Sequence, residues 1–149
     1  MDSNNLALLK KELINDEGLK LNVYQDSVGL WTIGVGHLLG TERRMMMITE
    51  AEAGALLDFD IQIALHLAYE YVPDLWADNE MKPFGKSRAR AIVNMAFNLG
   101  PRLKGFVNFL KAVNAKDWPT AAKEMMYSKW ATQVGARAER LRNQILTED

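Results

Sequence analysis

The chain has 149 residues, 18 basic against 19 acidic side chains, and no cysteine. A chain of this length can form one domain with a substantial core, and the absence of cysteine excludes disulfides and thiolate chemistry. The two histidines, His37 and His66, lack the spacing of metal ligands, so we expect no metal site and no cofactor.

Charge is distributed unevenly along the chain. Residues 1–80 contain 5 Lys and Arg against 14 Asp and Glu, whereas residues 81–149 contain 13 against 5. An acidic part and a basic part can attract each other across a cleft, and a basic face can bind an anionic polymer such as bacterial cell wall. The sequence contains no recognised nucleic-acid-binding motif, so nucleic acid is not the expected partner.

Neither a secretory segment nor a membrane span is expected. The N-terminal residues show no basic region followed by a long apolar run, and no window reaches the apolar length that a membrane-spanning helix requires. These features predict a protein that is made in a cytoplasm and has no signal peptide.

The first predicted helix covers residues 3–17. Ser3 can cap its start, leucines recur on one face, and Gly18 stands where a left-handed terminating residue is favoured. Glu17 is therefore expected to be the last helical residue.

The spacing of apolar residues along the chain changes after this helix. Residues 19–36 interleave apolar residues with glycines, which predicts two or three short strands joined by turns, with Asp26 and Ser27 at the first turn. Residues 41–48 fit either a third strand or a loop.

The remainder of the sequence is predominantly helical. The capping box formed by Thr49 and Glu52 predicts a long helix from about residue 50 to 71, where Pro73 prevents continuation. Another helix is expected from Ser87, as its cap, to Leu99. Shorter helices are expected at residues 105–114, 119–128 and 136–146.

These elements predict a single α+β domain that is predominantly helical. A small lobe of about residues 15–60 would contain a short antiparallel sheet, and the helix of about residues 50–71 would join it to a helical lobe. That helical lobe would comprise about residues 74–149 together with the N-terminal helix.

The candidate chemistry lies in two carboxylates, Glu17 and Asp26, on either side of a short extended segment. A glycine-rich turn then brings Thr32 and His37 nearby in sequence. Hydrolysis of a glycosidic bond needs two such carboxyls, one to protonate the leaving oxygen and one to activate water or stabilise the transition state. An arbitrary Glu and Asp at this spacing are more often solvated surface acids.

A longer ordered set of residues surrounds this pair. It includes Asp-Glu-Gly-Leu-x-Leu at 16–21, Thr-Ile-Gly-x-Gly-His at 32–37, and further matches within 50–60, 91–106 and 128–137. In this set, which covers nearly the whole chain, the sequence resembles the phage-type lysozymes, in particular those of T-even bacteriophages. The resemblance implies a lysozyme-like fold.

The resemblance also implies an activity. Such enzymes are muramidases, which hydrolyse the β-1,4 bond between N-acetylmuramic acid and N-acetylglucosamine in peptidoglycan by single-displacement inversion. Glu17 would then be the general acid, and Asp26 with Thr32 would position the attacking water. The expected enzyme is a monomer made in the host cytoplasm that serves host lysis through a separate holin, or wall penetration from a phage particle.

Four residues are expected to bind the substrate. Leu38 and Phe97 correspond to positions that line the sugar cleft, and Asn98 and Gln133 could form hydrogen bonds with acetamido groups. An apolar pair at lobe edges is also common in a protein core, and exposed amides often have no specific partner.

Four further residues are expected to support the site. The resemblance implies that His37 forms an ion pair with Asp60, a structural link rather than a catalytic contact. It also implies that Arg137 pairs with Glu17, while Trp130 is expected to pack beneath the cleft.

The sequence departs from the family pattern in two places. Only 11 residues, 38–48, separate His37 from the long helix, so an extra hairpin and short helix of the small lobe are expected to be absent. Two further cleft positions fall on Phe109 and Glu124, which lack the expected polar character, so substrate binding is not assigned to them.

Two alternative functions remain open at this point. A non-catalytic peptidoglycan-binding module would bind the wall without releasing reducing ends. A lytic transglycosylase would cleave the same bond with one general acid/base and without consuming water, so Asp26 would be dispensable.

Overall fold

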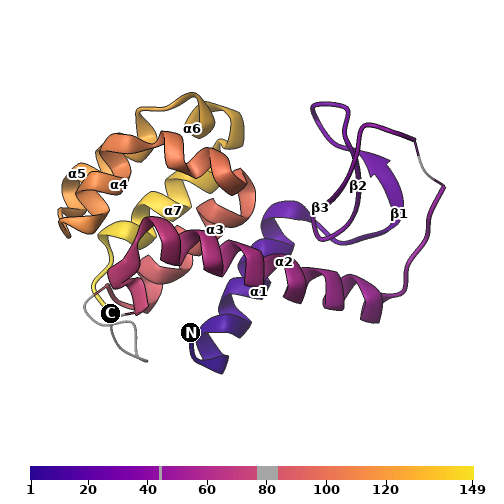
Figure 1. Cartoon of the computed structure of the whole chain (residues 1–149), viewed down its shortest axis with the longest axis horizontal. Helices are drawn as coiled ribbons and strands as arrows, with labels where there is room; N and C mark the ends of the chain where they lie inside the picture. The colour runs from indigo at the N-terminus through magenta and orange to yellow at the C-terminus, as the bar shows by residue number, and fades with distance from the viewer. Residues whose placement is uncertain (44, 77–83) are drawn as a thin grey trace. The chain divides into compact units, whose positions relative to one another are not determined.

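A computed structural model describes residues 1–43, 45–76 and 84–149. These residues form a predominantly helical α+β fold with one small sheet, as predicted from the sequence (Figure 1). The elements, with η for a 3-10 helix, are α1 (Ser3–Glu17), β1 (Lys20–Gln25), β2 (Trp31–Gly34), β3 (His37–Gly40), α2 (Glu50–Tyr71), η1 (Pro73–Trp76), α3 (Lys86–Leu99), η2 (Gly100–Gly105), α4 (Val107–Asn114), α5 (Trp118–Met126), α6 (Lys129–Val134) and α7 (Ala136–Leu146).

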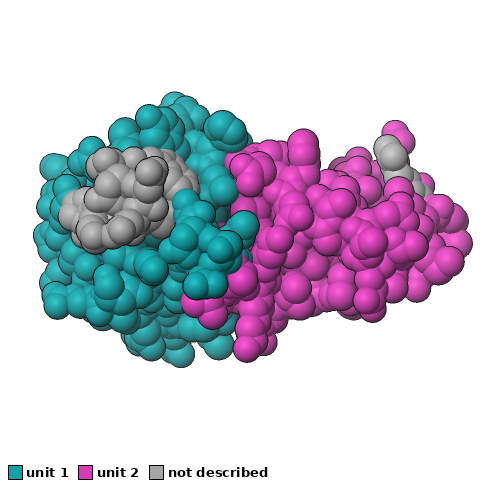
Figure 2. Space-filling view, turned by 90° about the horizontal axis from the view of Figure 1, so that it is seen from below, with its two compact units in different colours: residues 1–6, 64–149 teal, residues 7–63 magenta. Residues whose placement is uncertain are grey.

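The chain divides into two compact units. Residues 1–6 and 64–149 form unit 1, and residues 7–63 form unit 2 (Figure 2). Helices α1 and α2 each contain a boundary between the units, at Leu6 and at Ile63. Unit 2 contains the whole sheet, and unit 1 contains α3 to α7.

The sheet of unit 2 is antiparallel, with strand order β1-β2-β3. Thr32, in the central strand, has Tyr24 of β1 and Leu38 of β3 as its cross-strand partners. Cross-strand partners lie on the same face of a sheet about 5 Å apart, so this register places three side chains in one row.

The segment after β3 lies along the free edge of β1. Val23 N donates to Met46 O at 3.2 Å, and Ile48 N donates to Leu21 O at 2.9 Å. This part of residues 41–48 therefore pairs with β1 through its backbone but forms only an isolated bridge, not a regular strand.

A small apolar core lies behind the sheet of unit 2. Its fully buried members come from β2, from the segment before α2 and from α2 itself, with side chains of β1, β3 and α2 packed around them. They are Ile33, Ile48 and Ala53, surrounded by Leu21, Val23, Leu39 and Leu56.

Local sequence determines the end of α1 and the start of α2. Gly18 has φ +75° and its N–H donates to Ile14 O at 2.8 Å, which ends α1 after Glu17 as predicted. At α2, Thr49 N donates to Glu52 Oε1 and Glu52 N donates to Thr49 Oγ1, both at 3.1 Å, so the predicted capping box is confirmed.

The start of α3 differs from the prediction. The helix begins at Lys86 after Gly85, and Ser87 makes no side-chain cap. Instead, the Ser87 N–H donates to both carboxylate oxygens of Asp149 at 3.0 Å. The prediction of a serine cap was wrong because the capping group comes from a residue 62 positions away in the chain.

The other helices of unit 1 follow the expected order. Three of the predicted segments correspond to α4, α5 and α7, whereas η1, η2 and the six-residue α6 were not predicted. The α4–α5, α5–α7 and α3–α7 pairs pack against each other. The largest fully buried side chains in this unit include Phe84, Ile92, Met95, Leu103, Phe109 and Met125.

Two negative findings apply to residues 1–43, 45–76 and 84–149. None of the helices there has the length and apolar character needed to cross a lipid bilayer. No group of three or more His, Asp or Glu side chains in those ranges is arranged to hold a metal ion.

Candidate active site

Glu17 is held at the junction of α1 and the sheet. It is the last residue of α1, and its partly buried side chain covers Gly36 in the turn between β2 and β3. A Cβ atom on Gly36 would lie 2.9 Å from Glu17 Oε2 and 3.0 Å from Glu17 Cδ. The absence of a side chain at Gly36 is therefore what allows the carboxyl to lie there.

Asp26 lies in the turn between β1 and β2, and its carboxylate orders that turn. Its Oδ1 accepts hydrogen bonds from Val28 N at 3.0 Å and from Leu30 N at 2.8 Å. Its own N–H donates to Leu30 O at 2.8 Å. Both side-chain bonds use Oδ1, so Oδ2 is the oxygen available for a water molecule.

Thr32 follows in β2, and its side chain meets the same residue, Leu30. The Thr32 hydroxyl donates to Leu30 O at 3.2 Å, which leaves its lone pairs as acceptors. Only 4% of Thr32 is exposed, so it can contact solvent over a small area. Asp26 and Thr32 are thus connected through Leu30, whose backbone N–H and O form hydrogen bonds with them.

Tyr24 lies opposite Thr32 in the sheet, and its phenol responds to the charges of Glu17 and Asp26. It is the cross-strand partner of Thr32. Burial raises the pKa of the Tyr24 phenol above its ordinary value, and the negative charges of Glu17 and then Asp26 raise it further.

His37 and Asp60 are brought together within unit 2. The Nδ1 atom of His37, at the start of β3, lies 2.7 Å from Asp60 Oδ2 on α2, and both side chains are mostly buried. This pair links β3 of the sheet to α2. Leu38, the next residue of β3, is 55% exposed and is therefore accessible to a ligand.

The remaining predicted residues belong to unit 1. Trp130 is buried, and its Nε1 donates to Asn98 Oδ1 at 2.7 Å, which leaves the Asn98 amide nitrogen to bind other groups. The partly buried Phe97 lies next to it on α3.

Arg137 is also buried in unit 1. Its Nε and one terminal nitrogen donate to Asn94 Oδ1 at 3.0 and 2.9 Å. This bond joins α7 to α3. The pairing of Arg137 with Glu17 that the resemblance implies stays a prediction.

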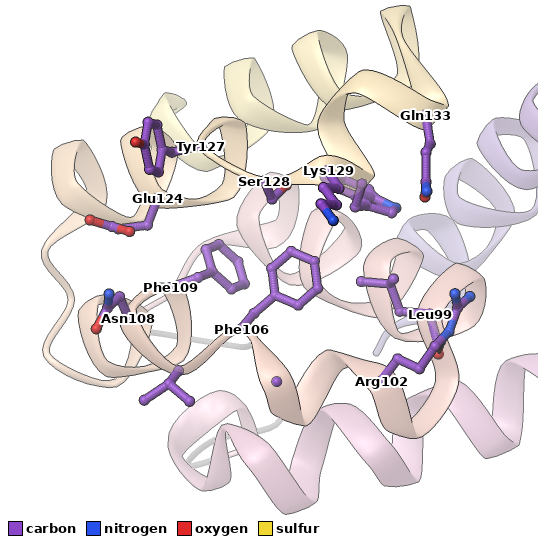
Figure 3. Close-up of a pocket in the computed structure, with 13 residues that line it drawn as sticks. Leu99, Arg102, Phe106, Asn108, Phe109, Glu124, Tyr127, Ser128, Lys129 and Gln133 are labelled. Atoms are coloured by element: carbon purple, nitrogen blue, oxygen red, sulfur yellow. Dashed lines mark hydrogen bonds between the residues drawn. The ribbon is translucent and has the colours of Figure 1, made fainter.

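Unit 1 contains a pocket of about 470 Å³ formed by η2, α4, α5 and α6. Figure 3 shows Phe106 and Phe109 at its centre, with Glu124 and Tyr127 toward one end and Gln133 toward the other. The ring of Phe106 also packs edge-on against Trp130, with centroids 6.1 Å apart. Four of the thirteen residues that line the pocket are therefore aromatic: Phe106, Phe109, Tyr127 and Trp130.

Polar groups surround these aromatic walls. Arg102 and Lys129 contribute cations, and Gln133 contributes an exposed amide. Sequence reasoning had assigned a binding role to Gln133 but not to Phe109 or Glu124, although all three line the pocket.

Two residues of the site were not assigned roles from the sequence. Tyr24 occurs in the matched motif, but only the β1–β2 register places it opposite Thr32. Gly36 also occurs in the motif, and the contact that explains it comes from α1. The spacing of residues along the chain indicates neither of these contacts.

Comparisons with known proteins place the chain in a family. The phage lysozyme family matches residues 15–146. The protein named "Probable T4-type lysozyme 1" of Dictyostelium discoideum is 33% identical over 159 residues, which cover 91% of this chain and 92% of that protein.

Two phage proteins are also similar. The pre-baseplate central spike protein Gp5 of Enterobacteria phage T4 is 31% identical over 172 residues, which cover 98% of this chain and 29% of that protein. The endolysin of Salmonella phage P22 is 29% identical over 135 residues, which cover 88% of this chain and 84% of the endolysin.

Proposed function

Because this chain belongs to the phage lysozyme family, and so is a peptidoglycan-degrading enzyme, we propose that it is a muramidase. The bond that it hydrolyses would be the β-1,4 linkage between N-acetylmuramic acid and N-acetylglucosamine. The reaction would be a single displacement with inversion at the anomeric carbon.

The effect of both Glu17 and Asp26 on the pKa of one phenol, that of Tyr24, is what supports this proposal most strongly. Both carboxyls act on the Tyr24 phenol, although one ends a helix and the other lies in a turn. Two carboxyls on separate elements can flank one glycosidic bond and act on it from two sides.

The environments of the two carboxyls fit different roles. Asp26 accepts two backbone N–H bonds on Oδ1, which hold the carboxylate in the turn and leave Oδ2 for a water molecule. Glu17 sits at the end of a helix, over the bare backbone of Gly36. We assign Asp26 as the base and Glu17 as the acid.

In the proposed reaction Glu17 loses one proton and Asp26 gains one. Glu17 gives its proton to the glycosidic oxygen as the bond from that oxygen to the anomeric carbon breaks. A water oxygen forms the new bond to the anomeric carbon, and its proton passes to Asp26. The Thr32 hydroxyl, which donates to Leu30, accepts a hydrogen bond from this water.

Binding of the wall polymer is assigned to exposed or partly exposed residues of each unit. Leu38 in unit 2 offers an apolar surface, while Phe97, Asn98 and Gln133 in unit 1 offer an aromatic ring and amides. The pocket adds aromatic faces and the cations Arg102 and Lys129, which suit a polymer that carries both acetamido and carboxylate groups.

The route to the wall is part of the same proposal. Among the similar proteins, one is named an endolysin and another a baseplate spike protein. We propose that the chain acts as a monomer, either released through the membrane by a separate holin or carried by a phage particle.

Product analysis distinguishes this reaction from the two alternatives. Purified sacculi are digested in water enriched in oxygen-18, and the released muropeptides are examined by mass spectrometry. We expect reducing ends that carry one solvent oxygen atom. Anhydro products without solvent oxygen would indicate a transglycosylase, and binding without release of fragments would indicate a non-catalytic module.

A further inference from the structure

A second hollow lies on unit 1, between α5 and α7. Its volume is about 320 Å³, and the residues that line it are Ala122, Lys123, Met126, Tyr127 and Arg142. We propose that this α5–α7 hollow binds a carboxylate of a peptidoglycan stem peptide, the short peptide attached to N-acetylmuramic acid. The inference rests on the proposed function, because it takes the wall polymer as the substrate.

Tyr127 connects the α5–α7 hollow with the larger pocket of about 470 Å³, because it lines both. Figure 3 shows Tyr127 at one end of the larger pocket, beside Glu124. Tyr127 is 88% exposed, so a ligand can contact it directly from solvent. A chain that is bound in the larger pocket can therefore continue past this ring into the α5–α7 hollow.

The α5–α7 hollow has a cation on each of its two helices. Lys123 belongs to α5 and Arg142 to α7, and no Asp or Glu is found among the described residues that line it. Neither cation forms an ion pair with a residue that the structure describes. Glu124, the acid next to Lys123 in sequence, lines the larger pocket instead. The charge of the hollow is therefore complementary to an anion.

The guanidinium of Arg142 is oriented by the next residue. Its Nε and Nη2 atoms donate to Asn143 Oδ1 at 3.3 and 3.2 Å, which occupies one edge of the group. The N–H groups of Nη1 and the second N–H of Nη2 lie on another edge. Parallel N–H groups of this kind match the two oxygens of a carboxylate. The geometry therefore favours a carboxylate among the possible anions.

The other lining residues favour a peptide as the carrier of that carboxylate. Ala122 and Met126 contribute apolar atoms to the hollow, and Tyr127 contributes an aromatic ring. A stem peptide combines carboxylates with the methyl groups of its alanines. Because this peptide is covalently attached to the glycan, a contact with it would add to the affinity that the glycan itself provides.

The test is the double variant Lys123→Gln/Arg142→Gln, assayed on two soluble substrates. One is wall glycan that keeps its stem peptides, and the other is the same glycan after an amidase has removed them. We expect KM on the peptide-bearing glycan to rise about fivefold, the size of a loss of exposed charge contacts, with kcat unchanged. KM on the peptide-free glycan, whose muramic acid still carries a carboxylate, should equal the wild-type value.

A matched control removes the same charge elsewhere on unit 1. Lys104→Gln/Lys111→Gln replaces two exposed lysines that line neither hollow, and it should change neither KM. Arg142→Lys keeps the charge but loses the planar edge, so it should produce part of the rise in KM. Thermal unfolding at the wild-type temperature would show that each variant is folded.

A binding measurement does not depend on hydrolysis. A free stem tetrapeptide is titrated into the wild-type chain, and the Nε–H signal of Arg142 is followed by NMR. We expect a shift that saturates with the peptide and is absent when its carboxylates have been converted to amides. Saturation without any hydrolysis of the wall would mean that the proposed function is wrong while the α5–α7 hollow still binds the peptide.

Four results would overturn the inference. An unchanged KM on the peptide-bearing glycan would mean that the two cations make no contact with the substrate. An equal rise on both glycans would place the contact on the sugar, and an equal rise in the control variant would indicate a general effect of charge. If Glu17→Gln is inactive, as the proposed function requires, and the Arg142 signal does not move, only the role of the α5–α7 hollow is wrong.

Discussion

Replacement of Glu17 by Gln is expected to reduce wall degradation by about 10³-fold, within the range found for loss of general acid–base catalysis. Glutamine has nearly the same shape, so it can occupy the place over Gly36, but it cannot deliver a proton to the glycosidic oxygen. The rate of clearing of permeabilised Gram-negative cells, together with the release of reducing ends, measures the effect.

A matched control separates the loss of the acid from the loss of a charge. Glu42→Gln removes an exposed carboxylate from the same unit and should leave the rate unchanged. Both variants should unfold at the temperature of the wild type. Clearing by Glu17→Gln at more than about a tenth of the wild-type rate would remove Glu17 from the mechanism.

Replacement of Gly36 by Ala is expected to lower activity by about 10²-fold, because small displacements of catalytic groups can cost that much. The new Cβ would lie 2.9 Å from Glu17 Oε2, so the carboxyl must move. Gly36 also has φ +64°, a conformation that costs an alanine about 1–2 kcal/mol. Kinetics on solubilised fragments and thermal unfolding measure the two effects separately.

Gly34→Ala is the control for the loss of stability that an alanine with positive φ causes. Gly34 has the same φ of +64°, but a Cβ there would meet Ile48 Cδ1 at 3.6 Å and Ala53 at 3.7 Å, which are ordinary contacts. We therefore expect a similar loss of stability in both variants and a loss of activity only at Gly36. Equal activity in the two variants would show that Gly36 does not hold Glu17 in place.

Elements encoded by neighbouring residues could be predicted from the sequence. The end of α1 depends on Glu17 being followed by a glycine, and the start of α2 depends on a reciprocal bond between Thr49 and Glu52. Both signals lie within four residues, so the pattern alone determines them.

Elements that depend on distant partners could not be predicted in this way. The cap of α3 comes from Asp149, and α6 is only six residues long, too short to show a helical period. The backbone oxygen of Met46 accepts a hydrogen bond from Val23 at the edge of β1, a pairing that no periodic pattern indicates.

The candidate site shows the same division. Glu17, Asp26 and Thr32 could be proposed from spacing and resemblance, and the family assignment is confirmed. The contacts that explain how they are held are tertiary: Gly36 lies beneath Glu17, and Tyr24 lies opposite Thr32. Residue spacing says nothing about which side chains meet across a sheet, so these supporting residues became evident only from the structure.

The configuration of the first sugar product tests the proposed mechanism most directly. Proton NMR can follow the anomeric signals of N-acetylmuramic acid ends during digestion, before the anomers equilibrate. Water held by Asp26 and Thr32 on the face opposite Glu17 must give the α anomer first. Initial release of the β anomer would mean retention of configuration, and attack by this water in a single displacement would then be wrong.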